Sequence, residues 1–358
     1  MTTSLQVLTD EAVDVLCRLI STPRISRDEG AAADLLQRFM QDDCGLPTQR
    51  NGHNLWSIAP DFDVQRPTLL LNAHIDTVKP VSAWTRDPFR PSLEGDQLFG
   101  LGSNDDGASL VALLQSFRVL REQADCSYNL IFLASAEEEV SGRGGIESVL
   151  PLLPPIDVAL VGEPTGMQPA VAEKGLMVLD VTAHGRAGHA AREEGDNAIY
   201  HAMDDMQWFR TKRWPLTSPL LGDVKMTVTI VQAGTQHNVV PDACTFTVDV
   251  RTNECYGNEE LLQLIQKEVH GDVKARSTRL NSSRIDADHW LVRRAIELGR
   301  TPFGSPTLSD QALLRCPSMK MGPGDSRRSH TADEFVCVSE IREAIALYLQ
   351  LLGGLTIC

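Results

Sequence analysis

Three short, uninterrupted apolar runs constrain this chain more than any other feature of its sequence. They lie at residues 67–72, 128–134 and 158–162, and polar residues follow each run at once. A strand without polar alternation is buried on both faces, as in parallel sheets that helices cover. Amphipathic patterns at 10–20 and 30–40, and a further helix expected at 108–120 after a Gly-rich turn, would supply such helices. The expected fold class is therefore α/β, a mostly parallel sheet with helices on both faces.

The pattern changes after about residue 168. Between 176 and 278 the order is strand, helix, strand, strand, helix and edge strand, which is the split βαβ layout. The first pattern returns from about residue 280. The sequence therefore predicts a catalytic domain made of residues 1–167 and 281–358. An inserted ferredoxin-like α+β domain, a lid or dimerisation domain, would occupy residues 168–280.

Composition excludes several classes of partner. The 358 residues include 33 Lys and Arg against 48 Asp and Glu, a formal charge of −15. Such a surface repels nucleic acid and anionic membranes, and no apolar run is long enough to span a bilayer. The N-terminus does not resemble a signal peptide, and the eight cysteines are scattered without a CxxC pair. We expect mostly buried, reduced thiols and a cytoplasmic protein.

Five clusters of histidines and carboxylates carry the candidate chemistry, and most of them follow a predicted strand. They are His74-Ile-Asp76, Asp105-Asp106, Glu137-Glu138-Glu139, Glu163 and His330. Open α/β sheets place their sites beyond the carboxyl ends of strands. Taken alone, each cluster also has a purely structural interpretation as a capped turn, a helix cap or a solvated loop. Together they supply mixed nitrogen and oxygen ligands, which suit zinc, cobalt or manganese.

Six ordered segments strengthen the metal interpretation. They are LNAHIDTV at 71–78, GLGSNDDG at 100–107, SAEEE at 135–139, VGEPT at 161–165, GRAGHAA at 185–191 and HTADEF at 330–335. In this order they resemble the M20 family of metal-dependent amidohydrolases, which includes acetylornithine deacetylases and succinyl-diaminopimelate desuccinylases. The resemblance covers essentially the whole chain. One departure is that the lysine usual in the 100–107 loop is missing.

The resemblance implies a centre for two metal ions, Zn²⁺ or Co²⁺, of which one site alone could be filled. His74 would hold one metal, and Asp76 would orient that histidine. Asp105 would bridge the two ions. Glu163 would complete the ligands of the first metal, and His330 those of the second.

The three consecutive glutamates leave two registers open. The resemblance favours Glu138 as the general base that takes a proton from a metal-activated water, with Glu139 as a metal ligand. In the other register Glu137 and Glu138 would be the functional pair.

Substrate recognition follows from the same resemblance. His189 would stabilise the oxyanion, and it would arrive by domain closure or from the partner subunit of a homodimer formed through the inserted domain. Arg251 would clamp the substrate carboxylate, since a guanidinium binds a carboxylate in bidentate fashion. Asn238 and Gly324 would complete the substrate pocket.

The expected reaction is metal-dependent hydrolysis of the amide of a small N2-acyl amino acid, as in an acetylornithine deacetylase of arginine biosynthesis. N-succinylornithine or N-acetylcitrulline deacylation and dipeptidase activity are the alternatives. A non-catalytic binding protein with this fold is a further alternative, but it would have no need of Glu138 and the five ligands.

Overall fold

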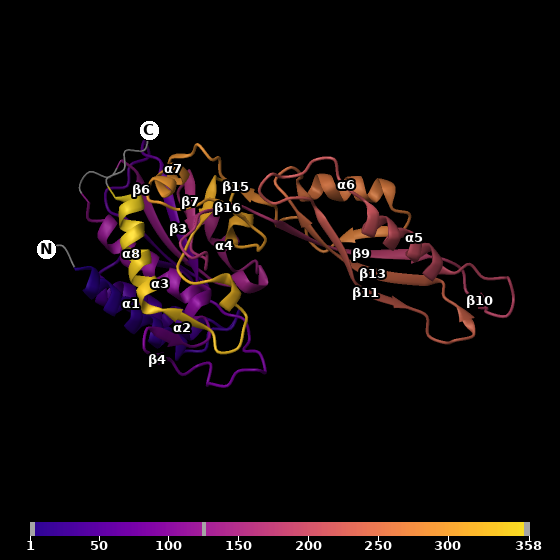
Figure 1. The fold of residues 1–358 in the computed structure, drawn as a ribbon, viewed down its shortest axis with the longest axis horizontal. Coiled ribbons are helices and arrows are strands. Elements are labelled where there is room, and N and C mark those ends of the chain that lie inside the picture. Colours follow the sequence, from indigo (N-terminus) through magenta and orange to yellow (C-terminus); the bar gives the residue numbers. More distant parts are fainter. Residues whose placement is uncertain (1–3, 124–126, 354–358) are drawn as a thin grey trace. The chain divides into compact units, whose positions relative to one another are not determined.

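The computed structural model describes residues 4–123 and 127–353, which form two compact units (Figure 1). The first unit comprises Met1–Val171, Ile285–Phe303 and Ser309–Cys358, and the second comprises Ala172–Arg284 and Gly304–Leu308. Unlike the predicted insertion at 168–280, the second unit therefore includes a short return segment. Ser305 belongs to it because its carbonyl accepts a hydrogen bond from Lys174 N at 3.2 Å.

The first unit is built on a mixed sheet with a parallel centre. The central strands β6, β3, β7 and β17 are parallel neighbours, and β2 and β1 extend them as an antiparallel edge. The bounds are β1 Thr48–Asn51, β2 Asn54–Ile58, β3 Thr68–His74, β6 Asn129–Ser135, β7 Val158–Val161 and β17 Ser318–Lys320. Every residue of β3 and β6 is buried, as their apolar runs predict.

Helices cover both faces of this sheet (Figure 1). On one face α1, α3 and α8 share the main hydrophobic core with β3 and β6. On the other face α4 packs in a smaller cluster that contains Trp56 and Ile131. The bounds are α1 Leu5–Ile20, α2 Gly30–Arg38, α3 Ala108–Leu120, α4 Ile146–Val149, α7 Trp290–Glu297 and α8 Val338–Leu352. The predicted α/β class is confirmed.

The second unit is a four-stranded antiparallel sheet in the order β11-β13-β9-β14. Side chains of β9 alternate between buried and half-buried, so one face is wet. Helices α5 and α6 pack on the other face. The bounds are β9 Gly175–His184, β10 Gly188–His189, α5 Ala198–Thr211, β11 Lys225–Ala233, β12 Val239–Val240, β13 Ala243–Thr252, α6 Asn258–Glu268 and β14 Asp272–Ala275.

Two further expectations concern membranes and thiols. No helix within the described ranges is long and apolar enough to cross a membrane.

The six cysteines in the described ranges are free, but only Cys244 is fully buried, so the expectation of mostly buried thiols was wrong. The other five are only partly buried. Cys126 and Cys358 lie outside the described residues.

Candidate metal centre

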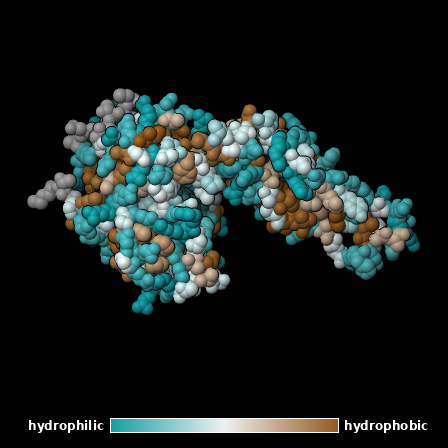
Figure 2. Space-filling view, in the orientation of Figure 1, coloured by the Kyte–Doolittle hydropathy of each residue, from teal (hydrophilic) through white to brown (hydrophobic). Residues whose placement is uncertain are grey.

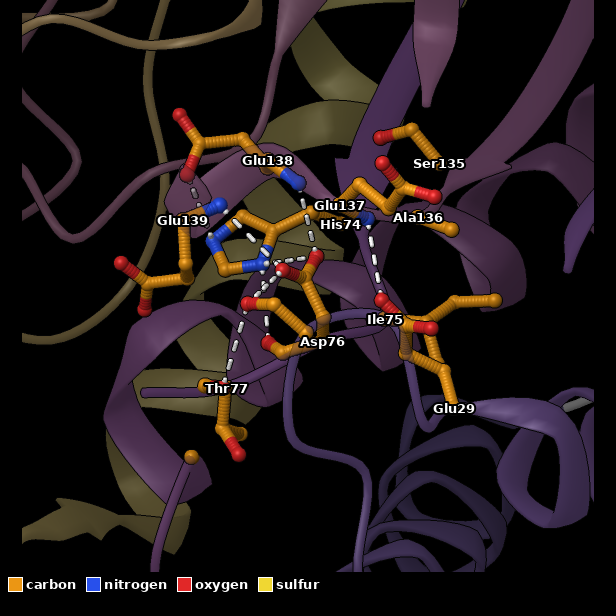
Figure 3. Close-up of polar contacts among 12 residues, drawn as sticks. Glu29, His74, Ile75, Asp76, Thr77, Ser135, Ala136, Glu137, Glu138 and Glu139 are labelled. Carbon is orange, nitrogen blue, oxygen red and sulfur yellow. Dashed lines mark hydrogen bonds and ion pairs between the residues drawn. The ribbon is translucent and has the colours of Figure 1, made fainter. Parts of the chain in front are cut away.

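The end of β3 places His74 and Asp76 in a buried, fully hydrogen-bonded setting (Figure 3). His74 Nδ1 lies 3.0 Å from the carbonyl oxygen of Asp76, so it donates there and leaves Nε2 as the ligand atom. The Asp76 carboxylate accepts hydrogen bonds from the backbone N–H groups of Glu138 and Glu139, at 3.0 and 3.2 Å. It also accepts one from Ser26 Oγ. Asp76 thus contacts both the histidine and the glutamate segment, and its role in orienting His74 stays a prediction.

Four predicted ligands converge on one point. Ligand atoms of His74, Asp105 and Glu139 all lie within 4.8 Å of one another. Asp105 directs Oδ1 at His74 Nε2, 3.2 Å away, and Oδ2 at His330 Nε2, 3.7 Å away. His330 Nε2 also lies 2.9 Å from Glu139 Oε2. A carboxylate with one oxygen toward each histidine is the arrangement that a bridging ligand needs.

The donor set fits divalent cations. Two imidazoles with carboxylates are ligands that zinc and cobalt accept. Glu139 Oε1 is buried and has no hydrogen-bond partner among the described residues, which leaves it open to a cation. A buried carboxylate oxygen without a partner is costly unless a cation satisfies it.

The loop that presents Asp105 is held from below by Glu334. The buried carboxylate of Glu334 accepts hydrogen bonds from the backbone N–H groups of Gly102, Asn104 and Asp105, at 2.8 to 2.9 Å. Gly324 packs against the same loop with φ +85°, and a Cβ there would lie 2.2 Å from Asn104 Oδ1. Gly324 is therefore needed for the close approach of two loops, and its contact with substrate stays a prediction.

The three glutamates point in different directions (Figure 3). Glu138 Oε2 lies 4.0 Å from His74 Nε2, and Glu139 contacts His330. Glu137 has φ 54°, and its carboxylate lies against the glycine loop, where Gly144 N donates to it at 3.4 Å. This geometry favours the Glu138 and Glu139 register.

Charge accumulates in the centre. Burial raises the pKa of Glu138 well above its usual range, and the nearby Glu163 and Asp310 raise it further, against an opposing effect of His74. Burial likewise raises the pKa of Glu139. The hydrogen bond that His330 Nε2 donates to the Glu139 carboxylate raises the pKa of His330 to about 9. The carboxylates therefore favour protons or other cations over isolated ionisation.

Glu163 follows β7 and is half-buried. Burial raises its pKa well above the usual range; Lys320 opposes this shift, and Asp105 and Asp106 reinforce it. Glu163 is thus within electrostatic reach of the converging ligands, and its role as a ligand stays a prediction.

The remaining predicted residues belong to the second unit. Pairing of β10 with β12 brings His189 beside Asn238, whose carbonyl accepts from Ala190 N at 3.0 Å. Ala191 N donates to His189 Nδ1, so the neutral ring carries its proton on the exposed Nε2. Arg251 lies toward the other end of β13 and is held in a bidentate pair by Asp249, at 2.9 and 3.1 Å.

Several buried polar residues around the centre were missed from the sequence. Glu29 accepts hydrogen bonds from Arg27 N and Glu137 N, at 2.7 and 3.1 Å. Arg24 is buried beneath the Asp105 loop. Neither belongs to a recognised segment. Glu334 was in the 330–335 segment, and only its position next to a predicted ligand could have drawn attention to it.

Comparison with known proteins identifies the family. The model for peptidase family M20/M25/M40 matches residues 70–353. The chain belongs to this family. An acetylornithine deacetylase of Myxococcus xanthus is 29% identical over 331 residues, which cover 85% of this chain and 83% of that protein. A succinyl-diaminopimelate desuccinylase of Cereibacter sphaeroides is 25% identical over 377 residues, covering 96% and 98%.

The solved structures show the same M20 fold. A tripeptidase from Staphylococcus aureus matches with a TM-score of 0.75 over 96% of this chain and 97% of its own, at 18% identity. Membership of the M20 family makes the chain a metal-dependent amidohydrolase.

Proposed function

We propose that this M20 enzyme hydrolyses the amide of a small N2-acyl amino acid, with N2-acetylornithine as the leading substrate. The observation that carries the proposal is the convergence of His74, Asp105, Glu139 and His330 beside a separate Glu138, whose side chain is only 10% exposed. A binding protein would need neither the excess of buried carboxylate nor a free base.

His74, Asp105, Glu139, Glu163 and His330 would hold the metal ions, Zn²⁺ or Co²⁺. Two such cations, when bound, would polarise the amide carbonyl and lower the pKa of a bound water toward about 7. Asp76 fixes the ring of His74 through Nδ1, which keeps Nε2 directed at the centre. The Oε2 atom of Glu138 lies 4.0 Å from Nε2 of that ring, so its carboxylate is placed to accept a proton beside the metal ligands.

Glu138 would take a proton from the attacking water as the water oxygen bonds to the amide carbon. It would return that proton to the nitrogen as the C–N bond breaks, which releases a carboxylate and a free amine. His189, with its proton on Nε2, would donate to the oxyanion. Arg251 would exchange Asp249 for the substrate carboxylate, and Asn238 and Gly324 would line the pocket.

Distances inside the second unit support a role for a partner subunit in supplying His189. Arg251 lies eight residues from Ala243 along β13, which is roughly 27 Å of extended strand. His189 and Asn238 lie toward the Ala243 end, where His184 pairs with Ala243. One copy of this unit therefore does not bring His189 and Arg251 to the same small substrate, and we propose that His189 acts from the partner of a homodimer.

The surface of the second unit supports this dimer. Strand β11 is an edge of its sheet, and Ile230 and Val231 on it are 49% and 51% exposed. On the neighbouring α5, Tyr200 and Met203 are 66% and 55% exposed. Hydrophobic residues gather over β9, β11 and β13 (Figure 2). An exposed edge strand with apolar neighbours is a surface that a second copy can cover.

A hydrolysis panel tests the proposal. N-acetyl and N-succinyl derivatives of ornithine and citrulline, and dipeptides, are assayed with chelated protein and after addition of Zn²⁺ or Co²⁺. We expect activity that chelation removes, that either ion restores, and that needs a free α-carboxylate. Preference for N-succinylornithine or N-acetylcitrulline would support the alternative deacylase activities. Preference for dipeptides would support the dipeptidase activity. The assignment to arginine biosynthesis and to the cytoplasm stays a prediction that follows the substrate.

A further inference from the structure

Arg24 is a charged side chain buried beneath the metal centre. It is 2% exposed, although it lies in the segment between α1 and α2. Its Nη1 donates to the carbonyl of Ile75 at 2.5 Å, and its Nη2 donates to the carbonyl of Gly102 at 2.7 Å. Ile75 separates His74 from Asp76, and Gly102 begins the loop that ends in Asp105. One guanidinium therefore joins the two segments that carry the predicted ligands.

The positive charge of Arg24 is not cancelled by a direct pair. Both of its hydrogen bonds go to carbonyl groups, and no carboxylate within the described part of the chain lies in ion-pair contact with it. Burial lowers the pKa of Arg24, whereas the surrounding carboxylates oppose this effect. These carboxylates are Glu334, Asp76, Asp106 and Asp105. The charge thus acts on the cluster as a whole.

Two glycines of the 100–107 loop allow the guanidinium of Arg24 to approach the backbone closely. Gly102 has φ +72°, and a Cβ there would lie 2.5 Å from Arg24 Nη2. A Cβ at Gly107 would lie 3.0 Å from the same atom. Residues 100–107 contain no basic side chain of their own. The cation beneath this acidic loop therefore comes from a distant part of the chain.

We propose that Arg24 is a resident counter-cation of the metal centre. It would stabilise the buried ligand carboxylates while no metal is bound, so that the site is already folded when the ions arrive. The same charge repels the incoming cations, so Arg24 also limits how tightly they bind. This inference rests on the metal centre of the proposed function.

The test compares urea unfolding midpoints of metal-free and Zn²⁺-saturated protein, together with Zn²⁺ affinity from chelator competition. In R24M the neutral side chain keeps most of the volume but loses the charge. We expect the metal-free midpoint to fall more than the metal-bound midpoint, and Zn²⁺ affinity to rise on the order of tenfold or more. R24K retains the charge, and its difference between the two midpoints should stay near that of the wild type.

R118M is the matched control. Arg118 is partly buried in the first unit, with its side chain 20% exposed, and its partners Glu11 and Gln115 lie on α1 and α3. R118M should lower both midpoints equally and leave Zn²⁺ affinity unchanged.

Three outcomes would overturn the counter-cation role. The first is that R24M lowers the urea midpoints of metal-free and Zn²⁺-saturated protein equally. The second is that R24M binds Zn²⁺ more weakly than the wild type. The third is that R24M fails to fold even with saturating Zn²⁺. If R24M folds only with Zn²⁺, the proposal is supported in its strongest form. Absence of Zn²⁺ and Co²⁺ binding by the wild type would instead contradict the metal centre itself.

Discussion

At the scale of single residues, neighbouring side chains of like chemistry have different roles because the backbone sends them to different partners. Glu137, with φ 54°, turns its carboxylate to the Gly144 backbone, whereas Glu138 stays beside His74. A base must be free of other partners and near the reacting water. The sequence left open whether Glu138 and Glu139 or Glu137 and Glu138 are the functional pair. That choice depends on the backbone angle φ at Glu137, which cannot be predicted from the pattern of residue types.

Paired substitutions test this difference. We expect E138Q to lower kcat roughly 10²–10⁴-fold with unchanged metal content, because the amide cannot accept the proton. E137Q, one residue away, should keep near wild-type kcat. The measurements are steady-state kinetics and metal analysis of both purified variants. Full activity of E138Q, with loss in E137Q, would favour the other register.

A second residue-scale prediction concerns pH. Its hydrogen bond with Glu139 raises the pKa of His330 to about 9 in the metal-free protein. A metal must displace that proton at any pH below about 9. This one group should therefore make the apparent metal affinity rise by roughly tenfold per pH unit until the pH reaches about 9. Zn²⁺ competition titrations between pH 6.5 and 9.5 measure the slope.

The variant H330Q should bind Zn²⁺ more weakly and with a slope smaller by about one proton. The control H184Q alters an exposed histidine that pairs with Asp272 in the second unit, and it should leave the slope unchanged. An identical slope in wild type and H330Q would show that His330 does not exchange its proton for a metal.

Residue roles could be predicted from the sequence where a residue lies in a recognised segment or where its geometry is local. His74 and Asp76 follow a buried strand, and their shared face is a property of extended chain. Arg24 contacts residues 51 and 78 positions away. Its neighbours are set by tertiary packing, and a single basic residue after a helix looks like any solvated one.

At the scale of elements, prediction depended on length and periodicity. The 108–120 pattern corresponds to α3 at the same bounds, because a mostly buried helix after a glycine turn has distinct ends. Helix α1 begins at Leu5, earlier than the 10–20 pattern predicts, because the Ser4 side chain caps Val7 N. Strand β17 has three residues, too few for any period to be visible.

A charge on the exposed edge strand β11 should weaken dimerisation. V231K places a charge in the middle of the proposed dimer surface, where its desolvation should weaken dimerisation on the order of 10–100-fold, about 1.4–2.8 kcal/mol. V64K is the control, since Val64 is 81% exposed in the first unit. Light scattering across a concentration series measures both. A V231K protein that dimerises like the wild type would exclude β11 from the interface.

At the scale of the whole molecule, the proposed function uses residues of both units. The metal ligands and Glu138 belong to the first unit, whereas His189 and Arg251 lie toward opposite ends of the second unit's sheet. The family resemblance of the sequence predicts both sets. It cannot say which copy supplies His189, because strand length and pairing, rather than residue type, set that distance.

Mixing two inactive variants decides between one copy and two. E138A lacks the base and H189A lacks the oxyanion donor, so each homodimer should be inactive. If His189 acts from the partner, a mixed dimer has one site with both residues intact, namely the site of the H189A chain served by the E138A chain. Random exchange at equal amounts makes half the dimers mixed, so about a quarter of wild-type activity should return.

Activity that stays absent after subunit exchange, with mixed dimers verified by mass spectrometry, would show that His189 acts within its own chain. The pair E138A and E139A is the control, because both changes affect the same first unit. A mixed dimer of these two chains has no intact site under either arrangement of His189. Recovery in the first mixture alone therefore identifies the donor as the partner's, which geometry within one sheet requires if Arg251 and His189 are to act on one substrate.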